Sequence, residues 1–305
     1  MKRASHVCEA GLVHALAAVF RTLPPAVALG LGAGIGDLAH GLGLRARVAR
    51  ENLALAFPER TPGERAAILA AHYRELGRVA AEYPRMPAIV RAPAGDYVAE
   101  VTGVDHLERA QAAGRGALLL TGHFGNFELL GAWLGRMHPV DFVVKPLTNP
   151  YVDRWLEGLR RESGVGTLPL GLGVRGVYRA LRENRWIALL ADQDARRDGV
   201  FVPFFGRDAS TPRGPAELAV RTGAPIVMGF GWRGADGRLR LDVGPTLTPD
   251  PGIADPEASV RDLTARHTAA LEARVRERPE QWFWLHRRWK TAPPAAPVAR
   301  ERIGA

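Results

Sequence analysis

Cysteine is almost absent from this chain: Cys8 is the single thiol among 305 residues. One thiol excludes an intrachain disulfide, so the protein needs no oxidising compartment in order to fold. The chain also has no His-Glu-x-x-His sequence and no spacing of cysteine and histidine that is typical of a metal site. Disulfide-rich secreted domains and the common zinc enzymes are therefore excluded, and we expect no bound metal.

Long hydrophobic runs are also missing. Residues 11–20 and 26–44 are rich in apolar side chains, but neither run reaches the roughly 20 residues that a membrane-spanning helix needs. We expect residues 1–44 to form a helical hairpin lying in the membrane interface, followed by arginines at residues 45–50 that could meet lipid phosphates. Two alternatives are a cleaved signal peptide and a helical pair packed on the following domain.

Several common catalytic signatures are absent as well. There is no Walker A sequence, and no serine lies in a Gly-x-Ser-x-Gly elbow, which argues against P-loop enzymes and α/β-hydrolases. Residues 34–39 fit the loose Gly-x-Gly-x-x-Ala form of the dinucleotide fingerprint, but no strand precedes them. We therefore expect no nucleotide cofactor.

Positive charge exceeds negative charge in this chain. Lys and Arg total 41 residues against 32 Asp and Glu, which gives a formal net charge of +9, carried largely by arginine. A basic surface favours an acidic partner: a nucleic acid, an anionic membrane or an acidic protein. Part of the excess also fits the arginine- and alanine-rich composition of high-GC genomes. Known nucleic-acid-binding motifs are absent, so we expect no nucleic acid partner.

Strand-like and helix-like segments alternate along most of the chain. Buried strands are predicted at residues 117–120, 140–144, 186–190 and 225–230, with an edge strand at 239–243. Helices are predicted at residues 66–82, 104–113, 127–134, 151–162, 174–183, 212–222 and 259–277. This alternation predicts an α/β fold with a single mixed, mostly parallel sheet flanked by helices. We expect a catalytic domain over residues 45–291, after the helical segment 1–44, and a loose tail over 292–305.

The most informative stretch is the turn between the first buried strand and the helix after it. It holds His123 and, five positions later, Glu128. On one continuous helix these side chains would lie about 140° apart, so they meet only if His123 precedes the helix. Glycines on both sides of His123 loosen the turn, and Asn126 is a good N-cap. We expect Glu128 to reach one imidazole nitrogen and leave the other as a general base.

Each of these candidate residues also has a purely structural interpretation. His123 can cap a turn, and Glu128 can be a solvated helix residue. Asp192 and Gln193 follow the strand at 186–190, at the edge where open α/β sheets bind ligands; the structural alternative is a sheet-end turn, which this position makes the weaker interpretation. Position alone therefore makes Asp192 and Gln193 candidates for supporting the site.

Four blocks of sequence carry a likeness to a known family. The first runs from Arg-Glu-Asn-Leu at residue 50 to Ala-Phe-Pro-Glu ending at residue 59, and the second is Gly-His-Phe-Gly-Asn-Phe-Glu at 122–128. The third joins Ala-Asp-Gln-Asp to Val-Phe-Val-Pro-Phe-Phe-Gly over 191–206, and the fourth is the tryptophan-rich run at 279–290. In this order they resemble the late acyltransferases of lipid A biosynthesis, within the wider glycerolipid acyltransferase group.

This resemblance implies a glycerolipid acyltransferase-like fold and an O-acyltransferase without a cofactor. The implied reaction moves a fatty acyl group from acyl carrier protein to a hydroxyl of a membrane glycolipid, such as a lipid A precursor. His123 would deprotonate the hydroxyl, and Glu128 would orient His123 and stabilise the imidazolium. The implied location is the cytoplasmic face of the inner membrane, where the basic charge suits anionic lipid and an acidic carrier protein.

Other residues receive supporting roles from the same resemblance. Lys145 stands where the family often has arginine, so a cation remains but the bidentate fork is lost. Arg154 and Arg160 lie on one predicted helix and either hold an acceptor phosphate, complete the site, or form a solvated helix face. Asn126, Asp192 and Gln193 are the remaining supporting candidates. The tryptophans at 282, 284 and 289 suit either a membrane interface or core packing.

Two functional alternatives stay open at this point. The nearer one keeps acyl transfer but uses another acceptor, namely a phosphoinositol mannoside, an aminolipid or a lysophospholipid. The farther one is a non-enzymatic, basic protein that binds membranes or nucleic acid. That alternative predicts that His123→Ala leaves function intact and that binding weakens steeply with salt.

Overall fold

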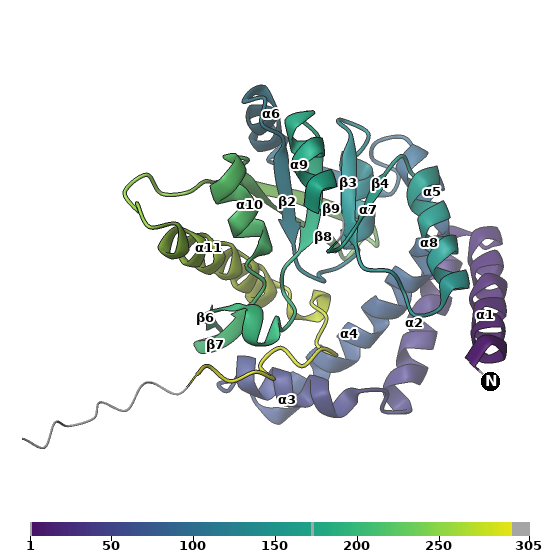
Figure 1. Cartoon of the computed structure of the whole chain (residues 1–305). Coiled ribbons are helices and arrows are strands. Elements are labelled where there is room, and N and C mark those ends of the chain that lie inside the picture. The colour runs from purple at the N-terminus through teal and green to yellow at the C-terminus, as the bar shows by residue number, and fades with distance from the viewer. Residues whose placement is uncertain (1, 172–173, 295–305) are drawn as a thin grey trace, which may run out of the picture.

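The computed structural model describes residues 2–171 and 174–294 (Figure 1). Its strands are β1 Val98–Thr102, β2 Ala117–Thr121, β3 Val140–Val144, β4 Gly166–Pro169, β5 Trp186–Leu190, β6 Val200–Phe204, β7 Arg207–Thr211, β8 Ile226–Arg233 and β9 Leu239–Leu247. Seven of them form one sheet in the order β1-β9-β8-β2-β5-β3-β4, and β6 and β7 form a separate hairpin. All neighbours in the sheet are parallel except β8 and β9, so the predicted mixed, mostly parallel sheet is confirmed.

Helices cover both faces of this sheet. The α-helices are α1 Lys2–Thr22, α2 Pro25–Gly41, α3 Ala46–Ala56, α4 Pro62–Glu82, α5 Met86–Arg91, α6 Val104–Ala112, α7 Phe127–Leu134, α8 Pro150–Glu162, α9 Val174–Arg182, α10 Gly214–Thr222 and α11 Pro256–Glu277. Short 3₁₀ turns lie at η1 Tyr83–Arg85, η2 Arg196–Asp198 and η3 Pro279–Gln281. One core contains residues from α3, α4, α9, α10 and α11, and the other contains residues from α5, α6, α7 and α8.

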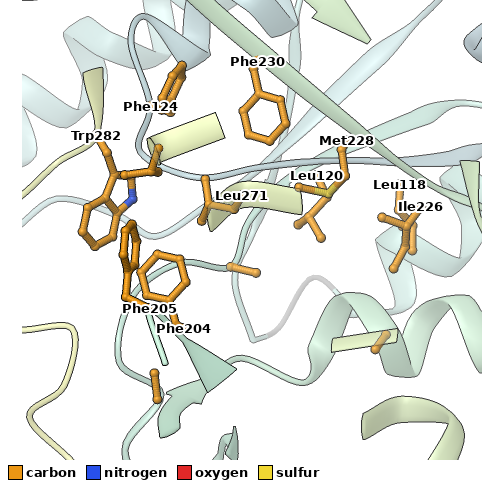
Figure 2. Close-up of a cluster of buried hydrophobic side chains, with 14 of the residues drawn as sticks. Leu118, Leu120, Phe124, Phe204, Phe205, Ile226, Met228, Phe230, Leu271 and Trp282 are labelled. Carbon is orange, nitrogen blue, oxygen red and sulfur yellow. The ribbon is translucent and has the colours of Figure 1, made fainter. Parts of the chain in front are cut away.

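Strand β2 lies at the centre of the sheet and contributes to both cores. Leu118 and Leu120 point into the first core and Leu119 into the second, because successive side chains of a strand alternate between faces. Figure 2 shows Leu118 and Leu120 beside Ile226 and Met228 of β8, their partners in the strand register. A strand buried on both faces appears in the sequence as a continuous apolar run, which is why β2 was predictable.

Two parts of the sheet differ from the sequence predictions. The edge strand predicted at 239–243 is wrong, since β9 has β8 on one side and β1 on the other. Its apolar–polar alternation instead reflects one half-exposed face, where Asp242 pairs with Arg274 of α11. The true edges, β1 and β4, are short strands without a clear alternating pattern and were not predicted.

The N-terminal helices α1 and α2 lie at one side of the molecule, beside α8 and α4 respectively (Figure 1). Helices α2 and α4 pack so closely that a Cβ atom added to Gly77 would lie 1.9 Å from the Gly32 carbonyl oxygen. The segment is therefore a helical pair packed on the following domain, and its place in a membrane interface stays a prediction. Among the described helices, none is by itself long and apolar enough to cross a membrane, although α2 and α3 meet that test as a pair bent by 91°.

Candidate active site

The loop that joins β2 to α7 carries His123 and is fixed along its whole length. The backbone N–H of His123 donates to Asp192 Oδ2 at 2.7 Å, and the His123 carbonyl accepts from the N–H of Phe283 at 2.9 Å. The N–H of Gly125 donates to the Gln281 carbonyl at 2.8 Å. Gly125 has a φ of +51°, and a Cβ atom there would lie 2.0 Å from the Gly231 carbonyl oxygen, so only glycine fits.

The register of two neighbouring strands brings His123 and Asp192 together. Thr121 at the end of β2 pairs with Leu190 at the end of β5, and the two side chains follow two residues after these positions. Because β2 and β5 are parallel, both loops leave the sheet at the same edge. That edge is where open α/β sheets bind ligands, as the sequence predicted for Asp192.

Asp192 holds the imidazole in one tautomer. His123 Nδ1 lies 2.8 Å from Asp192 Oδ1, and the indole N–H of Trp282 donates to Asp192 Oδ2 at 2.8 Å. An ionised carboxylate only accepts hydrogen bonds, so Nδ1 carries the proton and Nε2 of the neutral ring has a free lone pair. The side-chain nitrogen of Gln193 lies 3.4 Å from that Nε2. This arrangement gives the imidazole the chemistry of a general base.

The charges of this pair reinforce each other. Burial by itself lowers the pKa of His123, but the charge and hydrogen bond of Asp192, with the charge of Glu128, outweigh it and raise that pKa above its ordinary value of 6.5. Burial also works against ionisation of Asp192, yet His123 and Trp282 hold the pKa of that carboxyl well below its usual range. Asp192 therefore stays ionised and stabilises a proton on His123.

The expected contact between Glu128 and an imidazole nitrogen is wrong. Glu128 does lie in the first turn of α7, but its carboxylate faces α8 and forms a bidentate pair with Arg160. The Arg160 Nε–Oε2 distance is 3.0 Å, the Nη2–Oε1 distance is 2.5 Å, and both side chains are about nine-tenths buried. A guanidinium at this distance satisfies both carboxylate oxygens, so Glu128 acts on His123 only through its charge.

We predict that the two partners of this ion pair depend on each other for stability. Glu128→Gln or Arg160→Met alone leaves an uncompensated buried charge, which should lower the free energy of unfolding by about 3–5 kcal/mol. The double variant should lose clearly less than the sum of the two, as measured by urea unfolding. Arg47→Met, which breaks an exposed pair with Glu51, is the control and should cost about 1 kcal/mol or less. Strictly additive losses would contradict a coupled pair.

The other supporting candidates differ in their surroundings. Asn126 caps α7, since its side-chain oxygen accepts from the N–H of Leu129 at 3.1 Å, which confirms its predicted capping role. Lys145 lines the cavity that also contains Gln193. Arg154 is exposed and its guanidinium lies 5.2 Å from the centre of the Tyr151 ring, so the structure supports the solvated-face interpretation for this residue.

The C-terminal segment supplies contacts that the sequence did not predict. Trp282 and Trp284 are 1% and 0% exposed, so core packing is correct for them and a membrane-interface role is wrong. Trp289 is partly buried, and its indole N–H donates to the Phe204 carbonyl at 3.3 Å. Figure 2 shows Trp282 against Phe204, the last residue of β6, and Phe205, in the same core. A buried tryptophan usually needs a hydrogen-bond acceptor for its indole N–H, and this requirement could have predicted that the C-terminal tryptophans contact polar groups of the core.

Two cavities meet at His123. The first, of about 430 Å³, lies between α1, α4 and the C-terminal segment and is lined mainly by apolar side chains. The second, of about 380 Å³, lies over the ends of β2, β3 and β5 and includes Lys145, Arg160 and Gln193. His123 and Phe127 line both. Within the described ranges, no cluster of His, Cys, Asp and Glu is arranged to hold a metal ion.

Comparisons with known proteins show the family to which this chain belongs. A family model for bacterial lipid A biosynthesis acyltransferases matches residues 2–291. A phosphatidylinositol mannoside acyltransferase of Mycolicibacterium smegmatis is 33% identical over 88% of this chain and 87% of its own. Of two Escherichia coli relatives, a lipid A biosynthesis lauroyltransferase is 32% identical over 90% of this chain and 89% of its own. The other, a lipid A biosynthesis palmitoleoyltransferase, is 30% identical over 89% of this chain and 87% of its own.

These matches cover the N-terminal helices, the sheet and the C-terminal segment, not the His123 loop alone. They support an acyltransferase over a non-enzymatic basic protein, and they confirm the family inferred from the four sequence blocks. The chain belongs to the bacterial lipid A biosynthesis acyltransferase family.

Proposed function

We propose that this protein transfers a fatty acyl group from an acyl carrier protein thioester to a hydroxyl of a membrane glycolipid. The observation that carries the proposal is the position of the His123–Asp192 pair at the junction of two cavities. A two-substrate transfer needs a base at the point where an acyl donor and an acceptor meet. The nucleophile is then the substrate hydroxyl, because the described residues place no serine or cysteine side chain at His123.

In this mechanism His123 moves one proton from the acceptor hydroxyl to the leaving thiolate. Nε2 of His123 takes the proton of the acceptor hydroxyl as its oxygen attacks the thioester carbonyl carbon. The C–S bond then breaks, an ester remains on the acceptor, and His123 returns the proton to the leaving thiolate of the carrier. Asp192 keeps Nδ1 protonated throughout and stabilises the imidazolium that forms in between.

The negative charge on the thioester oxygen needs a hydrogen-bond donor in the same place. The Gln193 amide, 3.4 Å from Nε2, is close enough to the reacting atoms to serve, and Lys145 lines the same cavity. A donor that faces the developing oxyanion stabilises the transition state more than the ground state. Both side chains therefore belong to the proposed site as supporting residues. The Glu128–Arg160 pair, in the wall of that cavity, fixes α8 against α7.

The acceptor is proposed as a lipid A precursor or a related glycolipid. The relatives include lipid A enzymes of E. coli and a phosphatidylinositol mannoside acyltransferase at similar identity, so a phosphoinositol mannoside is the second candidate acceptor. The test is incubation of the purified protein with a series of acyl carrier protein thioesters and membrane lipid extracts, followed by mass spectrometry. A new O-acylated glycolipid supports the proposal. Transfer to an aminolipid or lysophospholipid instead would correct the acceptor.

We also propose that the N-terminal helices attach the protein to the cytoplasmic face of the inner membrane. Large apolar side chains are exposed along both helices and just after α2; they are Val7, Leu12, Leu16, Val19, Val27, Leu31, Ile35, Leu38, Leu42 and Leu44. Exposed arginines follow at residues 45, 47 and 50, as an anionic lipid surface requires. Other residues of α1, including Val13 and Phe20, line the first cavity, so a lipid bound there would lie next to the membrane.

Removing apolar side chains from this surface should release the protein from membranes. Leu12 and Leu42 are 64% and 67% exposed, and burying one leucine contributes about 1.5–3 kcal/mol. We expect Leu12→Glu combined with Leu42→Glu to weaken sedimentation with vesicles containing anionic lipid by about tenfold or more. Met137→Glu, at an exposed residue after α7, should bind as wild type. Equal binding by both variants would contradict attachment through α1 and α2.

A further inference from the structure

A second buried charged cluster contacts the end of the His123 loop through Asn126. It consists of Glu75 and Glu82 of α4, Arg233 at the end of β8, and Asn126 at the start of α7. Their exposed fractions are 4%, 3%, 9% and 4%. Burying three charged side chains is unfavourable unless each is paired, so the cluster has to be explained by its contacts.

Arg233 contacts both carboxylates, and Arg78 Nη1 donates to Glu75 Oε2 at 3.2 Å as a second cation. Arg233 Nε donates to Glu75 Oε1 at 3.0 Å, and Arg233 Nη2 lies 2.8 Å from Glu82 Oε2. Arg233 Nη1 donates to the Gly237 carbonyl at 3.0 Å, which ties the guanidinium to the turn after β8. The Glu82 carboxylate is therefore held in place by a residue of the sheet rather than by α4 alone.

Glu82 holds the end of the His123 loop in place through a hydrogen bond from Asn126. Asn126 Nδ2 donates to Glu82 Oε2 at 2.9 Å, while Asn126 Oδ1 accepts from the N–H of Leu129. These partners fix the orientation of the amide, because a carboxylate requires a donor and a backbone N–H requires an acceptor. Asn126 thus ends the loop three residues after His123 and fixes the first turn of α7 at the same time.

We propose that Glu82 is a positioning residue that holds the His123 imidazole in place through Asn126. This inference rests on the proposed function of His123. Neither Glu82 nor Asn126 is among the described residues that line the two cavities at His123, so they act through the loop and not on a substrate. Capping alone does not explain the choice of asparagine, since aspartate and serine cap a helix equally well. Asn126 uses two separate atoms, Oδ1 to accept from Leu129 and Nδ2 to donate to Glu82, whereas aspartate has no donor and serine has one oxygen for both bonds.

The test first removes the hydrogen bond between Asn126 and Glu82 and then restores it with donor and acceptor exchanged. Asn126→Asp keeps the cap and the shape of the side chain but sets two carboxylates against each other. A displacement of the base by about 1 Å costs about a hundredfold, so we expect kcat to fall about tenfold to a hundredfold with little change in KM. Adding Glu82→Gln supplies a donor that faces the new carboxylate, and kcat should recover to within about threefold of wild type.

Asn149→Asp is the matched control. Asn149 caps α8, is 8% exposed, and donates to Glu9 Oε2 at 3.1 Å, so the same substitution breaks the same kind of bond away from the His123 loop. We expect its kcat to stay near the wild-type value. An unchanged kcat in Asn126→Asp, a loss that Glu82→Gln does not restore, or an equal loss in Asn149→Asp would each overturn the proposal.

A second readout is independent of turnover. The Nδ1 proton of His123, which is hydrogen bonded to Asp192, gives its own NMR resonance. It should shift or broaden in Asn126→Asp and return in the double variant. If wild type makes no acylated lipid, the proposed function fails while this signal still decides the positioning role. If melting temperature recovers in the double variant but the resonance does not, the cluster is only structural.

Discussion

His123→Ala is expected to lower kcat/KM for acyl transfer by at least about a hundredfold, and by up to about 10⁴-fold. Of the described residues that line both cavities, His123 alone can remove the proton of the acceptor hydroxyl, so in the variant the attack must begin from a neutral alcohol. Substrate binding should change little, because both cavities keep their other walls. The measurement is the initial rate of acylated lipid formation, followed by mass spectrometry.

The control for this substitution is His106→Ala. His106 lies on α6, away from the two cavities, and its nearest polar partner is Arg109. It should retain the wild-type rate. Equal rates in wild type and His123→Ala would remove His123 from the chemistry and leave the proposed mechanism without a base.

Asp192→Asn is expected to cause a loss of about 10³–10⁴-fold in kcat. The asparagine side chain has nearly the same shape and can still accept from Trp282, so the fold should remain. Asparagine cannot stabilise an imidazolium. Its N–H faces Nδ1 and favours the tautomer in which Nε2 carries the proton. The same change in a serine-protease triad costs about 10⁴-fold. KM should change far less than kcat, because the lost interaction forms only as His123 takes up a proton.

The neighbouring carboxylate provides the control for Asp192. Asp194 lies two residues later and accepts from the hydroxyl of Thr291 at 2.9 Å rather than contacting His123. Asp194→Asn should therefore keep most of the activity. A loss of less than about tenfold in Asp192→Asn, or equal losses in both variants, would show that Asp192 does not orient the base.

The turn that carries His123 could be predicted from local sequence, but the side-chain pairing of His123 could not. The local pattern correctly placed His123 on a turn between a buried strand and a helix, with Asn126 as the helix cap, because turns and caps depend on nearby residues. The choice of Glu128 as the partner of His123 assumed a local contact. The true partner, Asp192, is 69 positions away, and its proximity depends on β2 and β5 being neighbours in the sheet.

The same distinction applies to the fold. The central strands were predictable because burial on both faces leaves a continuous apolar run. Strands β1 and β4 are short edge strands whose pairing is decided by their neighbours rather than by their own residues. The cluster of Glu75, Glu82 and Arg233 was not predicted either, since its members lie up to 158 positions apart and carry no motif.

The central claim is that His123 acts as a base whose proton affinity is set by Asp192. The most direct test is the pH dependence of kcat/KM in wild type and in Asp192→Asn. A base must be unprotonated to work, so activity falls as pH drops through the pKa of His123, which in wild type lies above 6.5. In Asp192→Asn, burial is no longer opposed by that carboxylate, and the acidic limb should move to lower pH. Identical acidic limbs in the two proteins would contradict the claim.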